Sequence, residues 1–191
     1  MTHFLRSGKV FLRPFEPSDA DAHHRWSSDA DIIRLASLGP PPSRAHAGRR
    51  VERWVEEQGK EAHGFVICLV DGARPIGEAS LFRIDQVNGT AELGIYIGEK
   101  DEWGKGYGTD AVHALVDFGF GWLRLERVFL EVWTENPRAI RSYEKAGFIR
   151  EATLRHDRFE DGVFTDGHLM SVLRDEWQAR RRATDPAAAE G

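Results

Sequence analysis

Cysteine is nearly absent from this 191-residue chain, and its single cysteine, Cys68, cannot form an internal disulfide. The residue lies in the apolar run "FVICLV", which favours a buried free thiol in a reducing cytoplasm. Long apolar runs are also missing, since none approaches the roughly 18 residues that cross a bilayer. The N-terminus "MTHFLRSGKVFLRP" lacks the apolar segment of a signal peptide. We therefore expect a cytoplasmic protein that does not act on membranes.

Basic residues are outnumbered, with 26 Lys and Arg against 31 Asp and Glu and a formal net charge of −5. This balance argues against general nucleic-acid binding, which favours a basic face. It weakly favours a small cationic partner such as an amine, although mild acidity also simply aids solubility. The length suits a single domain, which we expect over residues 1–178, followed by a flexible tail over 179–191.

Several common ligand motifs are missing. No His/Cys cluster has zinc spacing, and the adjacent His23 and His24 point in different directions on a predicted helix, so we expect no metal site. The P-loop requires Ser or Thr after its lysine, whereas Lys105 is followed by Gly106. The dinucleotide fingerprint requires a third glycine where Thr109 stands. A nucleotide bound here must therefore be held by a different architecture.

Changes of hydrophobic periodicity divide the chain into helices and strands. Helices are predicted over about residues 19–36, 44–61, 109–123 and 137–146, and strands over 9–15, 64–72, 74–85, 90–98 and 127–136, with a closing hairpin over 148–177. The third helix carries a core-facing stripe formed by Val112, Leu115, Val116, Gly119 and Phe120. This order predicts an α/β (α+β) fold: a single mixed, mostly antiparallel sheet with helices on both faces.

The stretch "WGKGYGT", residues 103–109, places three glycines between a strand and the third helix. The N–H groups at a helix N-terminus are unpaired and carry partial positive charge, and glycines allow the backbone to close on an anion. The segment Gly104–Thr109 is thus a candidate diphosphate cradle, with Lys105 adding charge. On this pattern alone, a turn that merely connects the two elements is the more common use.

The segment "ENPRAIRSYEKAGF", residues 135–148, resembles the second conserved block of the Gcn5-related N-acetyltransferase superfamily. "WGKGYGTDA" resembles its first block, Gln/Arg-x-x-Gly-x-Gly/Ala, in which Gly106 and Gly108 fill the glycine places. Trp103 departs from the pattern, because Gln or Arg usually stands there. The resemblance runs from about Phe11 to Trp177. With "LRPFEPSDAD" near the start, it is closest to the branch of ribosomal-protein N-terminal and spermidine acetyltransferases.

This resemblance implies a GNAT-like fold, acetyl-coenzyme A (acetyl-CoA) as donor and a primary amine as acceptor, whether a protein N-terminus, a polyamine or another small amine. It also implies direct attack in a ternary complex and suggests a homodimer. An acyl-CoA sensor without turnover and a structural domain with a silent pocket remain alternatives. The implied cofactor-binding residues are Ile95, Tyr96, Ile97, Trp103, Gly104, Lys105, Gly106, Tyr107, Gly108, Thr109 and Asn136. In the family, the strand segment pairs with the pantetheine arm, and one of its N–H groups, often at a bulge, polarises the thioester carbonyl.

Two residues of the second block have both a functional and a structural interpretation. Tyr143 matches the family tyrosine that protonates the departing thiolate, and the alternative is packing with Ala139 and Ile140 on the same helix face. Asn136 matches a residue that hydrogen-bonds the cofactor arm, but before Pro137 it is also a strong helix N-cap.

The base that accepts the amine proton is predicted to be Glu92. Strand alternation places Glu92, Gly94 and Tyr96 on one face, and a family carboxylate at this place often contacts the amine. A solvated or salt-bridged strand glutamate is the structural alternative. Glu131 on the next strand is the other candidate, and Glu135 is better explained as a helix-terminus charge. The tryptophans available for an acceptor pocket, for which core packing is the more common use, are Trp26, Trp54 and Trp133.

Overall fold

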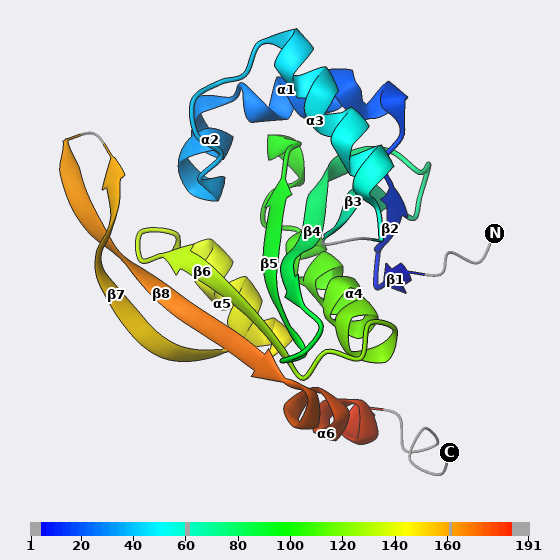
Figure 1. Cartoon of the computed structure of the whole chain (residues 1–191), viewed down its shortest axis with the longest axis vertical. Coiled ribbons are helices and arrows are strands. Elements are labelled where there is room, and N and C mark those ends of the chain that lie inside the picture. Colours follow the sequence, from blue (N-terminus) through cyan, green and yellow to red (C-terminus); the bar gives the residue numbers. More distant parts are fainter. Residues whose placement is uncertain (1–4, 60–61, 161, 185–191) are drawn as a thin grey trace.

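The computed structural model describes residues 5–59, 62–160 and 162–184. One sheet runs through the whole of this part, with strand order β1-β2-β3-β4-β5-β6-β8-β7 (Figure 1). The strands are β1 (Leu5–Ser7), β2 (Val10–Pro14), β3 (His63–Leu69), β4 (Pro75–Asp85), β5 (Thr90–Ile97), β6 (Arg127–Trp133), β7 (Ile149–Glu160) and β8 (Val163–Leu173). Neighbouring strands are antiparallel except β5 and β6, which are parallel. The predicted mixed, mostly antiparallel sheet is confirmed.

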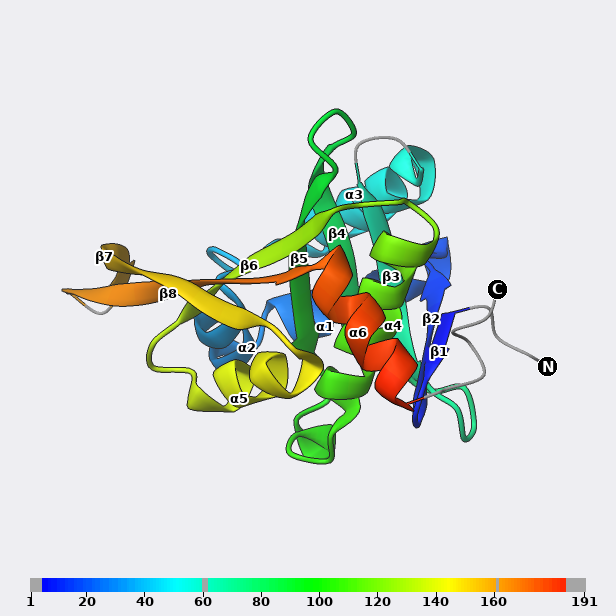
Figure 2. The same ribbon diagram turned by 90° about the horizontal axis from the view of Figure 1, so that it is seen from below.

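Helices cover both faces of the sheet, as predicted. They are α1 (Ala20–Ser27), α2 (Ala30–Ala36), α3 (Arg44–Glu57), α4 (Tyr107–Gly121), α5 (Pro137–Ala146) and α6 (Arg174–Thr184), with short 3-10 turns at Pro17–Asp19 and Lys100–Glu102. In Figure 1 the first three helices gather at one end of the sheet and α6 lies at the opposite end; Figure 2, seen from that end, shows α6 in front. Residues 60–61 of the second predicted helix lie outside the described residues.

The main core lies between the sheet and α4. The whole predicted stripe of α4 is buried: Val112, Leu115, Val116, Gly119 and Phe120. Alternate residues of the central strands join this core, and the intervening ones face α1 and α3 in a smaller cluster formed by Phe11, Phe15, Val51, Val66 and Cys68. Cys68 is fully buried, and this burial raises the pKa of its thiol.

The first predicted helix is divided in two. The break falls at Asp29, whose extended backbone (φ −82°, ψ 125°) ends the helical path. Its carboxylate then accepts hydrogen bonds from the N–H groups of Asp31 and Ile32 and so caps α2. The sequence analysis missed this N-cap because helical spacing of apolar residues is present both before and after Asp29. Because of this break, α2 runs in a different direction from α1 and contacts the central strand β5.

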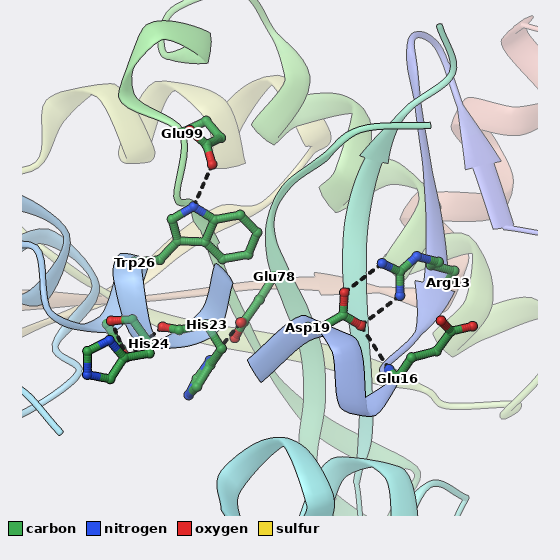
Figure 3. A network of polar contacts seen from close by, with 9 residues as sticks. Arg13, Glu16, Asp19, His23, His24, Trp26, Glu78 and Glu99 are labelled. Atoms are coloured by element: carbon green, nitrogen blue, oxygen red, sulfur yellow. Dashed lines mark hydrogen bonds and ion pairs between the residues drawn. The ribbon is translucent and has the colours of Figure 1, made fainter. Parts of the chain in front are cut away.

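Hydrogen bonds tie the N-terminal helices to the sheet (Figure 3). Inside the layer, His23 Nδ1 lies 2.7 Å from Glu78 Oε1, and both residues are buried. His23 thus joins α1 to β4, and its neighbour His24 takes no part in this pair. At the end of β5, Trp26 Nε1 donates to Glu99 Oε1 at 2.9 Å. These contacts hold α1 against the strands that line the site described below.

The C-terminal end differs from the sequence-based prediction. The closing hairpin ends at Leu173, and the chain then forms α6, which includes residues 179–184 of the predicted tail. Arg180 on this helix donates to the carbonyl oxygens of Ala146 and Gly147, both at 2.8 Å. Residues 185–191 of the predicted tail lie outside the described residues. Searched over the described chain, no helix is long and apolar enough to cross a membrane.

Candidate active site

The centre of the sheet is split. The parallel strands β5 and β6 pair only through Thr90–Glu92 and Arg127–Phe129. Beyond these residues β5 continues with β4 as its partner and β6 continues with β8, so the two strands diverge (Figure 1). A cavity of about 750 Å³ opens at the split and is also lined by residues of α2, α4, α5 and β7. The edge of β5 that faces it has no strand partner there, so its backbone groups suit an extended amide chain.

The glycine loop forms one wall of this cavity. Gly106 is the residue before α4 and has φ +90°, and Gly104 has φ +79°. A Cβ at either position would meet no atom within 4 Å, so the backbone conformation and not space requires glycine. Tyr107, Gly108 and Thr109 form the first turn of α4, where N–H groups have no partner inside the helix. Geometry of this kind fits a bound diphosphate.

Of the predicted cofactor-binding residues, only Lys105 does not line the cavity. Its ammonium instead lies 2.8 Å from Glu102 Oε2, and this hydrogen bond raises the pKa of Lys105. Glu102 also pairs with Arg74. The positive charge that the sequence placed in the loop is therefore largely neutralised by the loop's own carboxylate.

The β5 residues alternate as predicted. Ile95 and Ile97 pack on the main core beside α4, whereas Tyr96 faces α1 and lies edge-on to Trp26, with ring centres 6.5 Å apart. The Tyr96 hydroxyl is buried and has no hydrogen-bond partner among the described residues. Burial, followed by the charge of Glu78, raises its pKa well above the ordinary value. Pairing of β5 with β4 is continuous from Glu92 to Ile97. The register shift lies nearer the start of β5, between Thr90 and Glu92, opposite Phe82–Asp85 of β4.

Tyr143 lies on α5 and faces the cavity from the wall opposite β5. Its ring packs on Phe148 at 5.9 Å, and the residue is 8% exposed. Within the described chain no group hydrogen-bonds its hydroxyl. Burial raises its pKa to about 12, so the phenol is protonated at neutral pH and can act as a donor.

Asn136 has the predicted cap geometry. Its Oδ1 accepts a hydrogen bond from the N–H of Ala139 at 3.1 Å, and its Nδ2 donates to the carbonyl of Leu35 at 3.4 Å. The side chain thus begins α5 and also connects it to α2. It lines the cavity, where one amide hydrogen remains for a further acceptor.

Three carboxylates line the cavity on the α2 and β7 side: Glu92, Glu131 and Asp157. Glu92 Oε2 is paired with Arg83 Nη1 at 2.8 Å, and the Arg83 side chain is mostly exposed. Partial burial raises the pKa of Glu131, and the charges of Asp157 and Glu92 raise it further. Two guanidinium groups lie beside these carboxylates, Arg83 paired with Glu92 and Arg158 in the cavity lining. The three carboxylates outnumber them, so the group keeps a negative balance that favours a cation.

The sequence did not identify Asp157. A register shift between Leu154 and Arg158, with φ +51° at His156, reorients this part of β7. Asp157 occupies the space left by the missing side chain of Gly167 on β8. Nothing in the local pattern distinguishes this aspartate from other charged residues of the hairpin.

Only one of the three candidate tryptophans lines the cavity. Trp133 does so at the end of β6, with the Arg158 guanidinium 4.9 Å from its ring centre. Trp26 belongs to α1 and is buried against Tyr96 of β5, and Trp54 stacks on Phe15 at 5.9 Å. The described residues contain no group of three or more His, Cys, Asp and Glu side chains placed to hold a metal ion.

Comparison with known proteins gives a consistent result. Residues 9–149 match the family model described as an acetyltransferase (GNAT) domain. The chain is 30% identical over 175 residues to the uncharacterized N-acetyltransferase p20 of Bacillus licheniformis, covering 91% of this chain and 97% of the relative. It is 30% identical over 173 residues to spermidine N(1)-acetyltransferase of Escherichia coli (strain K12), covering 91% and 90%. The structure of Vibrio cholerae spermidine N-acetyltransferase in complex with CoA and spermine superposes with a TM-score of 0.82 at 25% identity, covering 89% and 98%.

Proposed function

Because the chain belongs to the acetyltransferase (GNAT) family, we propose that it acetylates a primary amine of a small polycation such as a polyamine. That it is an acetyl-CoA-dependent N-acetyltransferase follows from the family and from the relatives above. The observation that carries the proposal is that Glu92, Glu131 and Asp157 all line the cavity and lie close enough for the charges of Asp157 and Glu92 to act on Glu131.

The chain's residues support a division of the cavity into two ends. At one end, the first turn of α4 and the glycine loop would bind the diphosphate through backbone N–H groups. The unpaired edge of β5 at Ile95–Ile97 would bind the pantetheine amides, and the spare amide hydrogen of Asn136 would add a donor. The other end, with its carboxylates and Trp133, would take the amine. When bound, acetyl-CoA supplies a thioester at the junction of the two ends.

The reaction requires two proton movements. An amine with a pKa of roughly 10.4 is protonated at neutral pH and must lose a proton before it attacks. Glu92 is the proposed acceptor of that proton, directly or through water, with Glu131 as its neighbour on β6. Tyr143, held protonated by burial, would donate a proton to the departing thiolate. A thiolate in the same desolvated cavity also has a raised pKa, which favours the transfer.

A second positive charge on the acceptor explains why there are more carboxylates than the chemistry needs. One carboxylate suffices to accept a proton, whereas a polyamine presents a further ammonium group. Asp157 lies on a different strand from the proposed base and so can bind the distant ammonium while the reacting amine remains near Glu92. A peptide N-terminus carries a single reactive amine, so the backbone of such an acceptor offers no second ammonium group to the remaining carboxylates.

This proposal predicts a change of acceptor preference in Asp157→Asn. The ratio of kcat/KM for spermidine to that for butylamine should fall about tenfold, because one charge-assisted contact is lost. Asp71→Asn, the same change at an exposed residue away from the cavity, is the matched control. If the ratio in Asp157→Asn equals that of the wild type, or if a peptide N-terminus outcompetes spermidine, the polyamine assignment is wrong.

We also propose that the protein is a cytoplasmic homodimer. The dimer is suggested by the family resemblance, and Phe159, Val163 and Phe164 are exposed on the projecting β7–β8 hairpin, where a second chain could cover them (Figure 1). Sedimentation velocity should give twice the chain mass, and a purely monomeric species would contradict the dimer. The single buried Cys68 supports the location, which cell fractionation would test.

A further inference from the structure

Trp103 occupies the place where the family pattern has Gln or Arg, and the structure gives its indole a defined position. Its Nε1 donates to the carbonyl oxygen of Ile97 at 2.7 Å, which fixes the ring between the end of β5 and the glycine loop. Trp103 lines the cavity beside Gly104 and Gly106. An indole offers a single N–H, and here that group is already used, so Trp103 cannot itself replace the donors of Gln or Arg.

A guanidinium lies on the face of this indole. The Cζ atom of Arg138, in the first turn of α5, is 4.0 Å from the centre of the Trp103 ring, well within cation–π distance. The contact joins α5 to the residue that precedes the glycine loop. Both residues line the cavity. Burial lowers the pKa of Arg138 from its ordinary value, yet a guanidinium remains charged at neutral pH.

The charge of Arg138 is available to a ligand. In the part of the chain that the structure describes, no carboxylate pairs with it, whereas Lys105 in the loop is held by Glu102. Arg141 and Lys145 stand three and seven residues further along α5, on the same helix face, and they also line the cavity. The unneutralised positive charge near the cradle is thus on α5 and not on the loop.

We propose that Arg138, seated on the Trp103 ring, binds the diphosphate of coenzyme A and supplies from α5 the side-chain donor that the family pattern places at position 103. Trp103 acts as a positioning residue: the aromatic face restricts the guanidinium, so less side-chain freedom is lost when the phosphate binds. The inference rests on the proposed function, because it takes the glycine loop to be the diphosphate cradle.

Calorimetric titration with three ligands tests this inference without turnover. The ligands are coenzyme A, dephospho-coenzyme A, which lacks only the ribose phosphate, and pantetheine, which lacks all phosphates. Arg138→Gln should raise the Kd of the first two by the same factor, about 10- to 100-fold, because a charge-assisted phosphate contact is lost. Pantetheine binding, measured by competition, should not change. Arg49→Gln, an exposed arginine on α3 away from the cavity, is the matched control and should bind all three as the wild type does.

The role of Trp103 is tested by a double-mutant cycle. Trp103→Leu should weaken coenzyme A binding, and adding Arg138→Gln to it should have a much smaller effect than in the wild-type background. Trp103→Phe keeps an aromatic face, so in that background Arg138→Gln should retain most of its effect. Trp103→Met, which also removes the aromatic face, replaces the leucine variant if that variant does not fold. A change below twofold in Arg138→Gln, a loss confined to coenzyme A with dephospho-coenzyme A unaffected, or full additivity in the cycle would overturn the inference. If the wild type binds none of the ligands, the proposed function fails first.

Discussion

Replacing Tyr143 by phenylalanine should lower kcat about 100- to 10,000-fold, the usual contribution of a positioned general acid. Tyr143 lines the cavity, and its hydroxyl has no hydrogen-bond partner in the described chain. Burial raises its pKa to about 12, so the hydroxyl carries its proton well beyond neutral pH. Phenylalanine preserves the ring and its contact with Phe148 and removes only the proton. Initial rates of thiol release with saturating acetyl-CoA and amine measure the effect.

Two further readouts separate catalysis from packing in this variant. Thermal unfolding and the Kd of coenzyme A should stay close to the wild-type values, since the buried ring remains in place. If amine-dependent turnover stayed intact in Tyr143→Phe, the hydroxyl would have no role in catalysis. If turnover and stability fell together, the structural interpretation of Tyr143 would be correct instead.

The second large effect is expected for Glu92→Gln, which should reduce kcat/KM for the amine about 100-fold while leaving the Kd of coenzyme A unchanged. The substitution keeps the shape of the side chain but removes its capacity to accept a proton. Glu131→Gln makes the same change on the adjacent strand and is the matched comparison. Of the two variants, the one with the greater loss of kcat identifies the base. If Glu131→Gln lowered kcat more than Glu92→Gln, Glu131 would be the base and the assignment to Glu92 would be wrong.

The pH dependence of KM distinguishes Glu131 from the other carboxylates. The pKa of Glu131 is raised by its partial burial and by the negative charges of Asp157 and Glu92, so it takes up a proton at higher pH than an ordinary glutamate. As pH falls through this raised pKa, the carboxylate loses its charge and the KM for a cationic amine should rise. In Glu131→Gln the KM should be higher throughout, and this rise should disappear. In Asp157→Asn it should move to lower pH, because one source of the shift is removed.

The sequence predicted correctly those helices and strands whose ends are set by residues within or next to the element itself. Helix α5 is the clearest case, because Asn136 caps it, Pro137 begins it and Gly147 ends it with φ +98°. Helix α6 was missed because its sequence is largely polar, and its contacts are made with distant parts of the chain. Trp177 donates to Asp117 on α4 at 2.6 Å, and Arg180 binds carbonyl oxygens at the end of α5. No window of sequence contains those partners.

The same distinction between local and distant contacts decides which parts of the candidate site could be predicted. The cradle could be predicted because a glycine loop and the helix it precedes are contiguous. At the acceptor end, Glu92 and Glu131 could be proposed from their places on predicted strands. Asp157 could not, because its position depends on an irregular register of β7 and on Gly167 of β8. The partner of Trp103 was equally hidden, since Arg138 is 35 positions away and meets the indole only when α5 folds beside the loop.

The most direct test of the account is the reaction itself. Purified protein should be incubated with acetyl-CoA and spermidine, with the free thiol followed over time and the product examined by mass spectrometry. We predict thiol release that depends on the amine, with one acetyl group gained by spermidine for each thiol formed. Binding of acetyl-CoA without amine-dependent release, across polyamines, simple amines and peptide N-termini, would contradict the account and favour a sensor.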